Sequence, residues 1–344
     1  MRAVVIHAPH DLRIEEWPLE SLAAGQVRIA IEAGGICGSD LHYYHNGGFG
    51  TVRIQQPMVL GHEVAGTVDD IGPGVTGLNV GDRVAISPSR PCGRCTYCQT
   101  GAHNHCLDMR FYGSAMRMPH IQGAFRETLV ADAAQCFIVP PDLDAKSAAM
   151  AEPLAVCLHA VRRAGSLVGK RVLVTGAGPI GVLCAMAARR AGAIEIMVTD
   201  IEARPLDIAR TMVADKVHNV AQDPDALTGY AVDKGTIDVL FEASGNPAAL
   251  VGAFDALRPK ATIVQVGLGG EVTLPINTIV AKEFSLKGTF RFDEEFGHAV
   301  EMISRKLIDV APLVTATYPF SEARDAFDLA SDRNRAMKVQ LSFA

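Results

Sequence analysis

The sequence lacks any run of basic residues. Its 32 lysines and arginines are interspersed with 38 aspartates and glutamates, which gives a formal net charge of -6. A protein that tracks a phosphate backbone or an anionic membrane concentrates its positive charge in one run or patch. We therefore exclude nucleic acid as the expected partner. The chain also has no internal repeat and no low-complexity segment, so we expect a globular protein that acts on a small molecule.

Long hydrophobic runs are absent as well. No stretch approaches the roughly 20 uninterrupted apolar residues of a membrane span. The first residues, MRAVVIHAPHDLRI, lack the apolar core and cleavage site of a signal peptide. We expect a cytoplasmic protein with no membrane partner. In that reducing compartment, closely spaced cysteines serve as metal ligands or catalytic groups more often than as disulfides.

The length of 344 residues, of which 49% are hydrophobic, exceeds one ordinary core and fits two domains. Before residue 153, short β-like runs such as RAVVI and QVRIAIEA are broken by glycine and proline, which predicts an irregular, mostly antiparallel domain. After it, strands alternate with helices, which is typical of a parallel sheet covered on both faces. The predicted strands there are 170–176, 195–200, 216–220, 237–244 and 260–268, and the predicted helices are 179–192, 203–214 and 247–258.

In the C-terminal segment, from about residue 291, strands and helices no longer alternate regularly. This tail has predicted helices at 294–306 and 321–331 and a last strand at 336–343. We expect the tail to return to the first domain. The predicted limits are 1–152 with 291–344 for one domain and 153–290 for the other.

A glycine-rich turn lies between the first predicted strand and helix of the second domain. The stretch VTGAGPIG has G-x-G-x-x-G spacing, which lets a backbone approach a pyrophosphate at a helix N-terminus. Its predicted cofactor contacts are Gly176, Gly178, Pro179, Ile180 and Gly181. Asp200 ends the next predicted strand, where a carboxylate can bind the adenosine ribose and favours NAD over NADP. Arg204 lies close enough to weaken that preference. The alternative is a set of glycines that only closes a βα turn.

Four cysteines fall within fifteen residues. The stretch CGRCTYCQTGAHNHC has C-x2-C-x2-C-x7-C spacing and contains Cys92, Cys95, Cys98 and Cys106. Four thiolates from one loop match the closed tetrahedral site of a structural zinc. An iron–sulfur cluster is the alternative, because the spacing is similar to ferredoxin-type runs. His103 and His105 lie in the loop and can each replace a thiolate.

A closed metal site leaves catalysis to residues elsewhere. A thiolate, an imidazole and one or two carboxylates from separate loops can build a catalytic zinc site, which keeps one exchangeable position. Taken singly, each candidate is more typical of a buried core residue or a salt-bridged acid. The candidates are Cys37, Ser39 and His42 in GGICGSDLHYY, His62 and Glu63 in LGHEVAG, and Glu152 in MAEPLAV.

Together these stretches resemble the zinc-containing medium-chain dehydrogenases. GGICGSDLHYY, MVLGHEVAGTV, VGDRVAI, AEPLAV, TGAGPIG and VQVG occur in the family's order and approximate spacing over nearly the whole chain. The resemblance implies an α/β protein: a GroES-like, partly barrel-like β catalytic domain and a Rossmann domain with a doubly wound parallel sheet. It implies that Cys37, His62 and Glu63 or Glu152 hold a catalytic zinc. It also implies that the four clustered cysteines hold a structural zinc in a lobe around 88–110, and that the chain forms a homotetramer.

The branch of the family is indicated by Glu152. Its stretch AEPLAV stands where alcohol dehydrogenases tend to have another cysteine, which resembles the polyol dehydrogenases such as sorbitol and xylitol dehydrogenase. Two features depart from that group: Phe292 replaces an expected tyrosine, and Pro205 stands where an arginine is common near the ribose. By this resemblance the substrate pocket contains Tyr43, Glu152, Arg291 and Phe292, and the nicotinamide lies beside Val266, Gly267, Leu268, Phe290 and Arg291.

Within the branch, the stretches PSRPCGRCTYC, DMRFYGSAM and LKGTFRF look most like the bacterial L-idonate 5-dehydrogenases, which interconvert L-idonate and 5-keto-D-gluconate. The family's chemistry implies that zinc polarises the substrate hydroxyl while hydride passes to NAD or NADP. Ser39 and His42 resemble the family's proton relay through the cofactor ribose. A sugar acid also needs a partner for its carboxylate, and we predict Arg291, Arg110 or Arg117.

The sequence alone leaves other functions open. Sorbitol, xylitol or L-threonine 3-dehydrogenase would use the same zinc and cofactor. A regulatory zinc- and NAD-binding protein with an inactive dehydrogenase fold is the alternative outside the enzymes.

Overall fold

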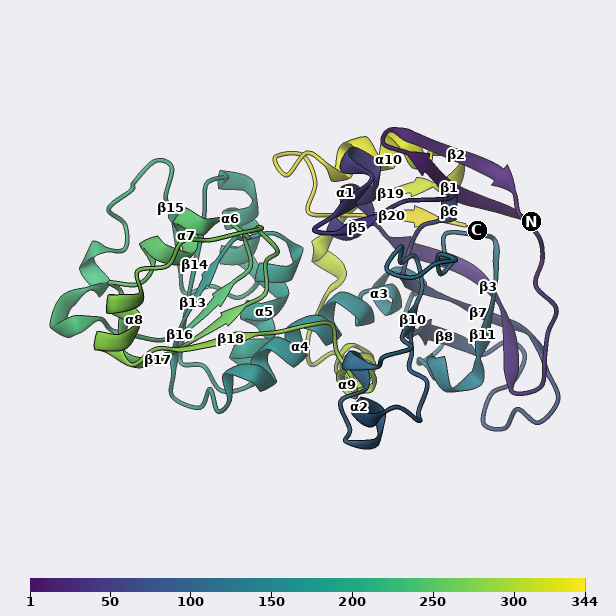
Figure 1. The fold of residues 1–344 in the computed structure, drawn as a ribbon, viewed down its shortest axis with the longest axis horizontal. Coiled ribbons are helices and arrows are strands. Elements are labelled where there is room, and N and C mark those ends of the chain that lie inside the picture. The colour runs from purple at the N-terminus through teal and green to yellow at the C-terminus, as the bar shows by residue number, and fades with distance from the viewer. Residues whose placement is uncertain (344) are drawn as a thin grey trace. The chain divides into compact units, whose positions relative to one another are not determined.

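The protein, seen in a computed structural model that describes residues 1–343, forms two compact units (Figure 1). The first unit comprises residues 1–152, 296–332 and the described residues from 338 onward. The second unit comprises residues 153–295 and 333–337. The units change over at 152/153, where the sequence places its boundary, and at 295/296, five residues after the predicted one. The assignment of catalytic and cofactor domains to these limits stays a prediction.

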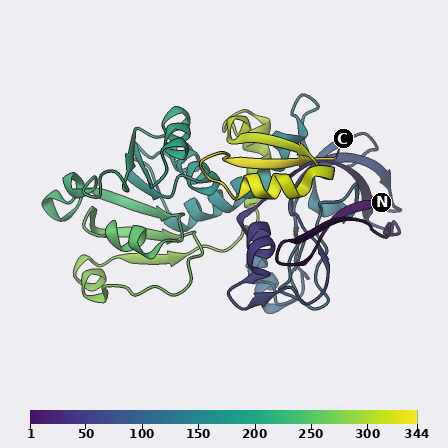
Figure 2. The same cartoon turned by 90° about the horizontal axis from the view of Figure 1, so that it is seen from above.

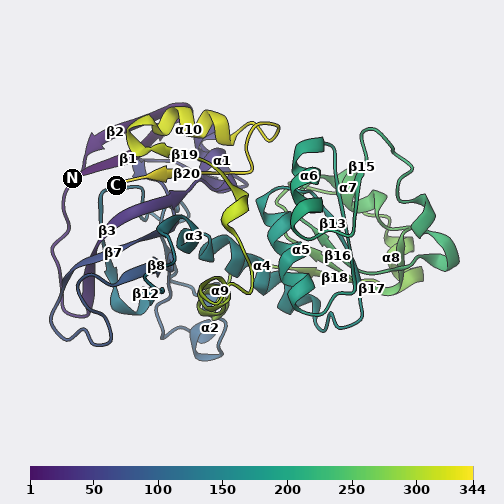
Figure 3. The ribbon, with the colours of Figure 1, turned by 180° about the vertical axis from the view of Figure 1, so that it is seen from behind.

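The second unit is built on one parallel sheet. Its six strands follow the order β15-β14-β13-β16-β17-β18, all paired in parallel, as the sequence predicts for a doubly wound sheet. Helix α5 contacts β13, β14 and β16, and α6 contacts β14 and β15 (Figure 3). The strands are β13 (Arg171–Thr175), β14 (Glu195–Asp200), β15 (Lys216–Asn219), β16 (Ile237–Glu242), β17 (Leu257–Gln265) and β18 (Ser285–Gly288). The helices are α4 (Ala151–Ala164), α5 (Pro179–Arg190), α6 (Ala203–Met212), α7 (Pro247–Gly252) and α8 (Ile276–Lys282).

One helix of the second unit is shorter than predicted. The helix expected over 247–258 ends at Gly252, and β17 already begins at Leu257. Ala253, Phe254 and Ala256 lie in the hydrophobic core together with Leu257. A surface helix would turn one face of such a run to solvent. Burial of Ala253, Phe254, Ala256 and Leu257, with Asp255 alone exposed among them, therefore favours a tight connection into the sheet.

The first unit is centred on the long strand β3 (Gln26–Gly35). In the seven-stranded sheet β3 pairs with β7, β11 and β20, all antiparallel. The other strands are β1 (Arg2–Ala8), β2 (Asp11–Glu16), β4 (Gly48–Phe49), β5 (Val52–Arg53), β6 (Met58–Val59), β7 (Glu63–Ile71), β8 (Arg83–Ile86), β9 (Ser89–Arg90), β10 (Arg110–Phe111), β11 (Thr128–Asp132), β12 (Cys136–Ile138), β19 (Val314–Pro319) and β20 (Lys338–Ser342). The helices are α1 (Gly38–Asn46), α2 (Thr96–Gln99), α3 (Ala145–Ala149), α9 (Glu295–Ser304) and α10 (Ala323–Ala330).

The C-terminal segment completes this sheet. Strand β20 pairs with the end of β3, with Gln340 opposite Gly35, and α10 packs beside β19 and β20 (Figure 2). Residues separated by some 300 positions in the sequence thereby become neighbours. Among the described residues, no helix combines the length and the apolar character that crossing a bilayer requires.

Candidate active site and zinc centres

The pairing of β3 with β7 brings the first three candidate ligands together. Cys37 follows β3 and is the N-cap residue of α1, while Glu63 is the first residue of β7 and lies opposite Gly35. His62 immediately precedes Glu63 in the chain. One sulfur, nitrogen or oxygen atom from each of Cys37, His62 and Glu63 lies within 4.8 Å of the others. The sheet register thus brings Cys37 to His62 and Glu63, which lie 25 and 26 positions further along the sequence.

Gly35 makes room for one of these ligands. A Cβ atom built on Gly35 would overlap the Oε2 atom of Glu63. Any larger residue there would push the carboxylate of Glu63 away from Cys37 and His62. The glycine of the predicted GGICG stretch is therefore a spatial requirement of the donor set.

The sequence reasoning missed Asp40, which is fully buried at this site. Its Oδ2 atom accepts from the amide of Cys37 at 3.0 Å, and its Oδ1 atom accepts from the amide of Gly61 at 3.2 Å. Oδ1 also lies 3.8 Å from Nδ1 of His62, which has no hydrogen-bond partner among the described residues. Burial raises the pKa of Asp40. An acid on the far side of a ligating imidazole orients the ring, so Asp40 is placed to hold His62 and the Cys37 turn together.

Lys338 is the second residue that was missed. It begins β20, is only 4% exposed, and donates from Nζ to both carboxylate oxygens of Glu63, at 2.8 and 2.6 Å, and to the carbonyl of Ile36 at 3.1 Å. Burial alone would lower the pKa of Lys338, but the charge and hydrogen bonds of Glu63 together with the charges of Cys37 and Glu152 outweigh it, and the pKa is raised. Lys338 therefore holds a buried positive charge against one candidate ligand.

Glu152 lies near the same centre in the first turn of α4 and is 5% exposed. It is not part of the compact trio of Cys37, His62 and Glu63. Burial raises the pKa of Glu152 to about 8, and the neighbouring charges of Glu63 and Cys37 add to the rise. This geometry favours Glu63 over Glu152 as the direct ligand. The assignment of the third ligand stays a prediction.

The donor set fits a zinc ion chemically. In the metal-free chain, burial and the carboxylate of Glu63 raise the pKa of Cys37 to about 12, so the thiol keeps its proton. Among residues 1–343, the site combines one thiol, one imidazole and several buried carboxyl groups with a single lysine to balance its acids. A divalent cation would supply the missing positive charge and displace these protons. Thiolate, imidazole and carboxylate are also the donors that zinc takes in catalytic sites.

The predicted proton relay lies on α1. Ser39 is half-buried and His42 is exposed, one turn further along the helix. Although His42 reaches solvent, partial burial of its ring and the charge of His45 lower the pKa of His42, which keeps the ring neutral and able to accept a proton at physiological pH. Ser39 and His42 make no hydrogen bond with each other in residues 1–343. A relay between them therefore needs a bridging group, as the prediction of a ribose hydroxyl requires.

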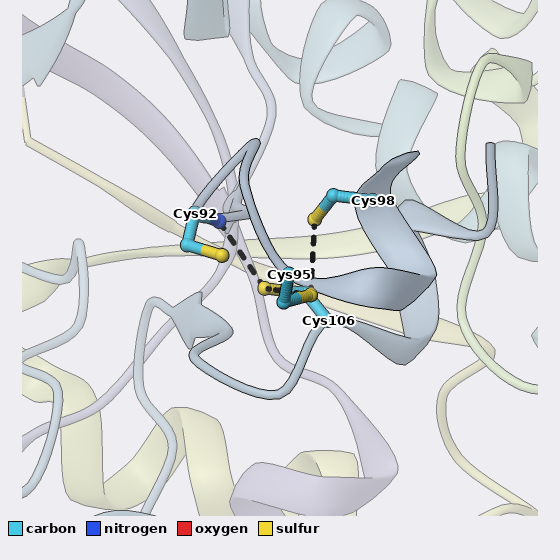
Figure 4. Close-up of side chains that lie close together, drawn as sticks. All are labelled: Cys92, Cys95, Cys98 and Cys106. Carbon is cyan, nitrogen blue, oxygen red and sulfur yellow. Dashed lines mark hydrogen bonds between the residues drawn. The ribbon is translucent and has the colours of Figure 1, made fainter. Parts of the chain in front are cut away.

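The cysteine lobe forms a second compact donor set (Figure 4). The sulfur atoms of Cys92, Cys95, Cys98 and Cys106 all lie within 4.8 Å of one another. The sulfur of Cys95 lies 3.6 Å from that of Cys98 and 3.9 Å from that of Cys106. Sulfurs at the corners of a tetrahedron with 2.3 Å zinc–sulfur bonds lie about 3.8 Å apart, so the spacing fits one zinc ion.

Backbone amides support thiolates in this lobe. Amides at Cys98 and Leu107 lower the pKa of Cys95 to about 6, and Cys106 accepts from the amides of Cys92 and Asp108 at 3.1 and 3.3 Å. Amide donors of this kind stabilise thiolate sulfur. The four thiolates of an iron–sulfur cluster are divided among at least two iron atoms, so that sulfurs on different irons lie farther apart. The geometry therefore favours zinc.

The glycine turn has the form of a phosphate cradle. Gly176 follows β13 with φ of +91°, Gly178 is the N-cap of α5, and a Cβ atom on Gly181 would overlap the carbonyl of Gly176. Pro179 and Ile180 open the helix. Glycine is thus required by conformation at the first position and by close packing at the third, which matches a dinucleotide turn.

Asp200 is already engaged in shaping this turn. Its Oδ2 atom accepts from the amide of Ala177 at 2.6 Å, and its Oδ1 atom accepts from the amides of Ile201 and Glu202 at 2.7 and 3.0 Å. Arg204 is exposed on α6. Asp200 therefore holds the turn in place in addition to the ribose role that the sequence predicts for it.

The predicted substrate residues differ in exposure. Tyr43 is 1% exposed and its hydroxyl accepts from the amide of Ala115 at 2.9 Å, while Phe292 is also 1% exposed. Arg110 is exposed on β10, and Arg117 pairs with Asp108.

Around the predicted nicotinamide position, Val266 and Gly267 are half-buried, while Leu268 is exposed. The guanidinium of Arg291 lies 4.9 Å from the ring centre of Phe290, and Arg291 has a positive φ of 53°. The predicted substrate and nicotinamide residues belong to both units, so a shared pocket stays a prediction.

Known proteins match this chain along nearly its whole length. Residues 23–141 match the alcohol dehydrogenase GroES-like domain, and residues 179–305 match the zinc-binding dehydrogenase domain. L-idonate 5-dehydrogenase (NAD(P)(+)) of Escherichia coli K12 is 44% identical over 92% of this chain and 91% of its own length. Sorbitol dehydrogenase of Bacillus subtilis 168 is 35% identical over 99% of this chain and 97% of its own. The crystal structure of L-idonate 5-dehydrogenase from Escherichia coli superposes with a TM-score of 0.95 at 41% identity, covering 99% of this chain and 97% of that one.

Proposed function

We propose that this chain, which belongs to the zinc-binding dehydrogenase family, oxidises the secondary alcohol of L-idonate to 5-keto-D-gluconate with NAD or NADP. The observation that carries its assignment as an active enzyme is the compact trio of half-buried Cys37 and buried His62 and Glu63. An inactive regulatory protein has no need to keep these donors together with a buried acid and a buried lysine around them. The 44% identity to a protein named L-idonate 5-dehydrogenase supports the substrate.

The chain's own residues would prepare the reaction as follows. Cys37, His62 and Glu63 would hold the zinc, which when bound supplies a Lewis acid for the substrate oxygen. Asp40 would keep the imidazole of His62 in one orientation, and Lys338 would limit the negative charge that Glu63 brings to the buried site. These contacts fix the donor set before substrate arrives, so little reorganisation accompanies the reaction.

Ser39 would take the proton from the substrate hydroxyl and pass it through a hydroxyl of the cofactor ribose to His42, which would release it to solvent. The exposure of His42 and the lowered pKa of its ring both suit the outer end of such a path. The nicotinamide, when bound, supplies the hydride acceptor. Residues 176–181 and Asp200 of the second unit would hold its dinucleotide portion.

The first test is steady-state oxidation of L-idonate, sorbitol, xylitol, D-gluconate and L-threonine, with NAD and with NADP, before and after metal removal by a chelator. We expect kcat/KM to be highest for L-idonate and to fall to background without metal. A preference for sorbitol or xylitol would keep the zinc chemistry and replace the substrate, in line with the 35% identity to sorbitol dehydrogenase. Turnover that survives metal removal would contradict the assignment of Cys37, His62 and Glu63.

We expect one arginine to pair with the substrate carboxylate. The candidates are Arg110, Arg117 and Arg291. Arg117 already pairs with Asp108, and Arg291 lies over the ring of Phe290. Among residues 1–343, Arg110 has neither a carboxylate partner nor such a ring contact, so we expect it to be the first choice. Replacing the responsible arginine by alanine should raise KM for L-idonate by about ten- to a hundredfold, since charge-assisted bonds contribute roughly 1.5–3 kcal/mol. Sorbitol, which has no carboxylate, is the matched substrate, and its KM should stay unchanged. Unchanged KM for L-idonate in all three variants would refute this assignment.

The homotetramer and the cytoplasmic location stay predictions. The unpaired edge of β18 in the second unit, with Leu286 44% exposed, is a surface on which strands of two copies can pair. Sedimentation of the 36.6 kDa chain gives the subunit number directly.

A further inference from the structure

Glu242 is a fully buried acid that the proposed chemistry leaves without a role. It is the last residue of β16, has no exposed surface, and lies in register between Thr175 of β13 and Gln265 of β17. Those three strands are neighbours in the centre of the parallel sheet. Glu242 therefore lies at the carboxyl ends of the central strands, the edge at which open α/β sheets bind their ligands.

Both oxygens of Glu242 act as hydrogen-bond acceptors. Oε1 accepts from the amide of Ser244 at 2.9 Å and from the Ser244 hydroxyl, while Oε2 accepts from Nε2 of Gln265 at 2.6 Å. The amide of Gly245 lies 3.1 Å from both oxygens, and the hydroxyl of Thr175 lies 3.4 Å from Oε1. Two backbone amides and a carboxamide nitrogen can only donate, which describes a carboxylate anion. No ion pair of Glu242 occurs within residues 1–343, so neutral dipoles alone stabilise its charge.

The same residue ties together the loops that leave the sheet. The backbone carbonyl of Glu242 accepts from the amides of Val266 and Gly267, both at 2.8 Å. Strand β17 ends just before these residues, at Gln265, whereas the sequence predicts a strand over 260–268. The carboxylate of Glu242 holds the amides of Ser244 and Gly245 in the preceding loop.

Glycines let these loops approach each other closely. A Cβ atom on Gly267 or Gly269 would overlap backbone atoms of Gly245, and a Cβ atom on Gly176 would lie 2.8 Å from the amide nitrogen of Ser244. The glycine turn after β13 is therefore in contact with the loop that Glu242 anchors. A shift of the Glu242 carboxylate would move loops 243–246 and 266–269 and the support of Gly176.

We propose that Glu242 is the positioning residue of the dinucleotide site, and that its buried negative charge strengthens the binding of the oxidised cofactor relative to the reduced one. The inference rests on the proposed function, in which residues 176–181 and 266–268 hold NAD or NADP. The oxidised nicotinamide ring carries a positive charge that the reduced ring lacks. A fixed, buried anion at the edge of the site attracts that charge more strongly than it acts on the neutral ring.

Three variants separate position, charge and general stability. Glu242→Gln keeps the size of the side chain and removes the charge. Glu242→Asp keeps the charge and shortens the reach to Ser244 and Gly245. Asp238→Asn is the matched control, because Asp238 lies on the same strand β16 away from this edge and accepts from the amide of Arg171 at 2.9 Å.

Dissociation constants of each protein for NAD and NADH, measured by calorimetry and by NADH fluorescence, decide the proposal. We expect Glu242→Gln to raise the ratio of the NAD to the NADH dissociation constant on the order of tenfold. Glu242→Asp should weaken the binding of NAD and of NADH by a similar factor, and Asp238→Asn should leave both dissociation constants unchanged. In cofactor-free protein, hydrogen exchange over 243–246 and 266–269 should be faster in both Glu242 variants than in the control.

A ratio in Glu242→Gln equal to that of the wild type would overturn the role of the charge. Affinities in Glu242→Asp equal to those of Asp238→Asn would overturn the role in positioning. Wild-type protein that binds neither NAD nor NADH would refute the proposed function itself, and this inference would fall with it.

Discussion

Replacement of Cys37 by serine is expected to lower kcat/KM by about three orders of magnitude or more and to remove one of the two zinc ions. Serine is close to cysteine in size and is a favoured N-cap residue, so α1, which begins after Cys37, should still form. A neutral hydroxyl is a poor substitute for a thiolate on zinc. Loss of the Lewis acid takes away several kcal/mol of stabilisation of the developing negative charge, and each 1.4 kcal/mol is tenfold in rate.

Metal analysis by mass spectrometry, alongside activity, checks this expectation. Cys136→Ser is the matched control, because Cys136 is a half-buried cysteine of the same unit that belongs to neither donor set. That control should keep two zinc ions and near wild-type activity. The sole tryptophan, Trp17, packs on Ala3, Val5 and Val59 of the first unit, so its fluorescence reports whether each variant has kept that unit folded. A folded Cys37→Ser protein with two zinc ions and normal turnover would refute the catalytic assignment of Cys37.

The sequence predicted the parts of the site that follow from spacing. The cysteine cluster and the glycine turn are contained in single stretches, and their residue types limit the chemistry strongly. Cys37, His62 and Glu63 were found through the order of several stretches, since none of them is distinctive alone. Their proximity depends on the register of β3 with β7, in which Gly35 lies opposite Glu63, and periodicity does not fix such a register.

Asp40 and Lys338 show what spacing left out. Asp40 was within reach of prediction, because an acid three residues after an N-cap position is typical of a capping box, and Asp40 does accept from the amide of Cys37. Lys338 was not. Its role depends on the long-range pairing of β20 with β3, and a lone lysine in AMKVQLSF has the appearance of an ordinary edge-strand charge. The same limit applies to Glu242, whose neighbours Thr175 and Gln265 come from two other strands.

Replacement of Lys338 by methionine is expected to cost about 3–5 kcal/mol of the unfolding free energy of the first unit in metal-free protein. Methionine fills a similar volume, but it leaves the carboxylate of Glu63 buried without its cation, and removing one partner of a buried pair costs this much. Urea unfolding followed by the fluorescence of Trp17 measures the loss in this unit. Lys282→Met is the control for the loss of a lysine in the second unit, because Lys282 donates to three carbonyls there and has no carboxylate partner in the described chain. The unfolding transition that Trp17 reports should stay at its wild-type position in this control.

Zinc should rescue the Lys338→Met variant more than the wild type. A dication at Cys37, His62 and Glu63 supplies the positive charge that Lys338 no longer provides, and a ligand that binds only the folded state adds its binding energy to stability. We therefore expect the urea midpoint of Lys338→Met to rise further on zinc addition than that of the wild type. In the double variant Cys37→Ser with Lys338→Met the extra rise should disappear. A zinc response of Lys338→Met no larger than the wild-type response would mean that Lys338 and the metal do not act on the same carboxylate.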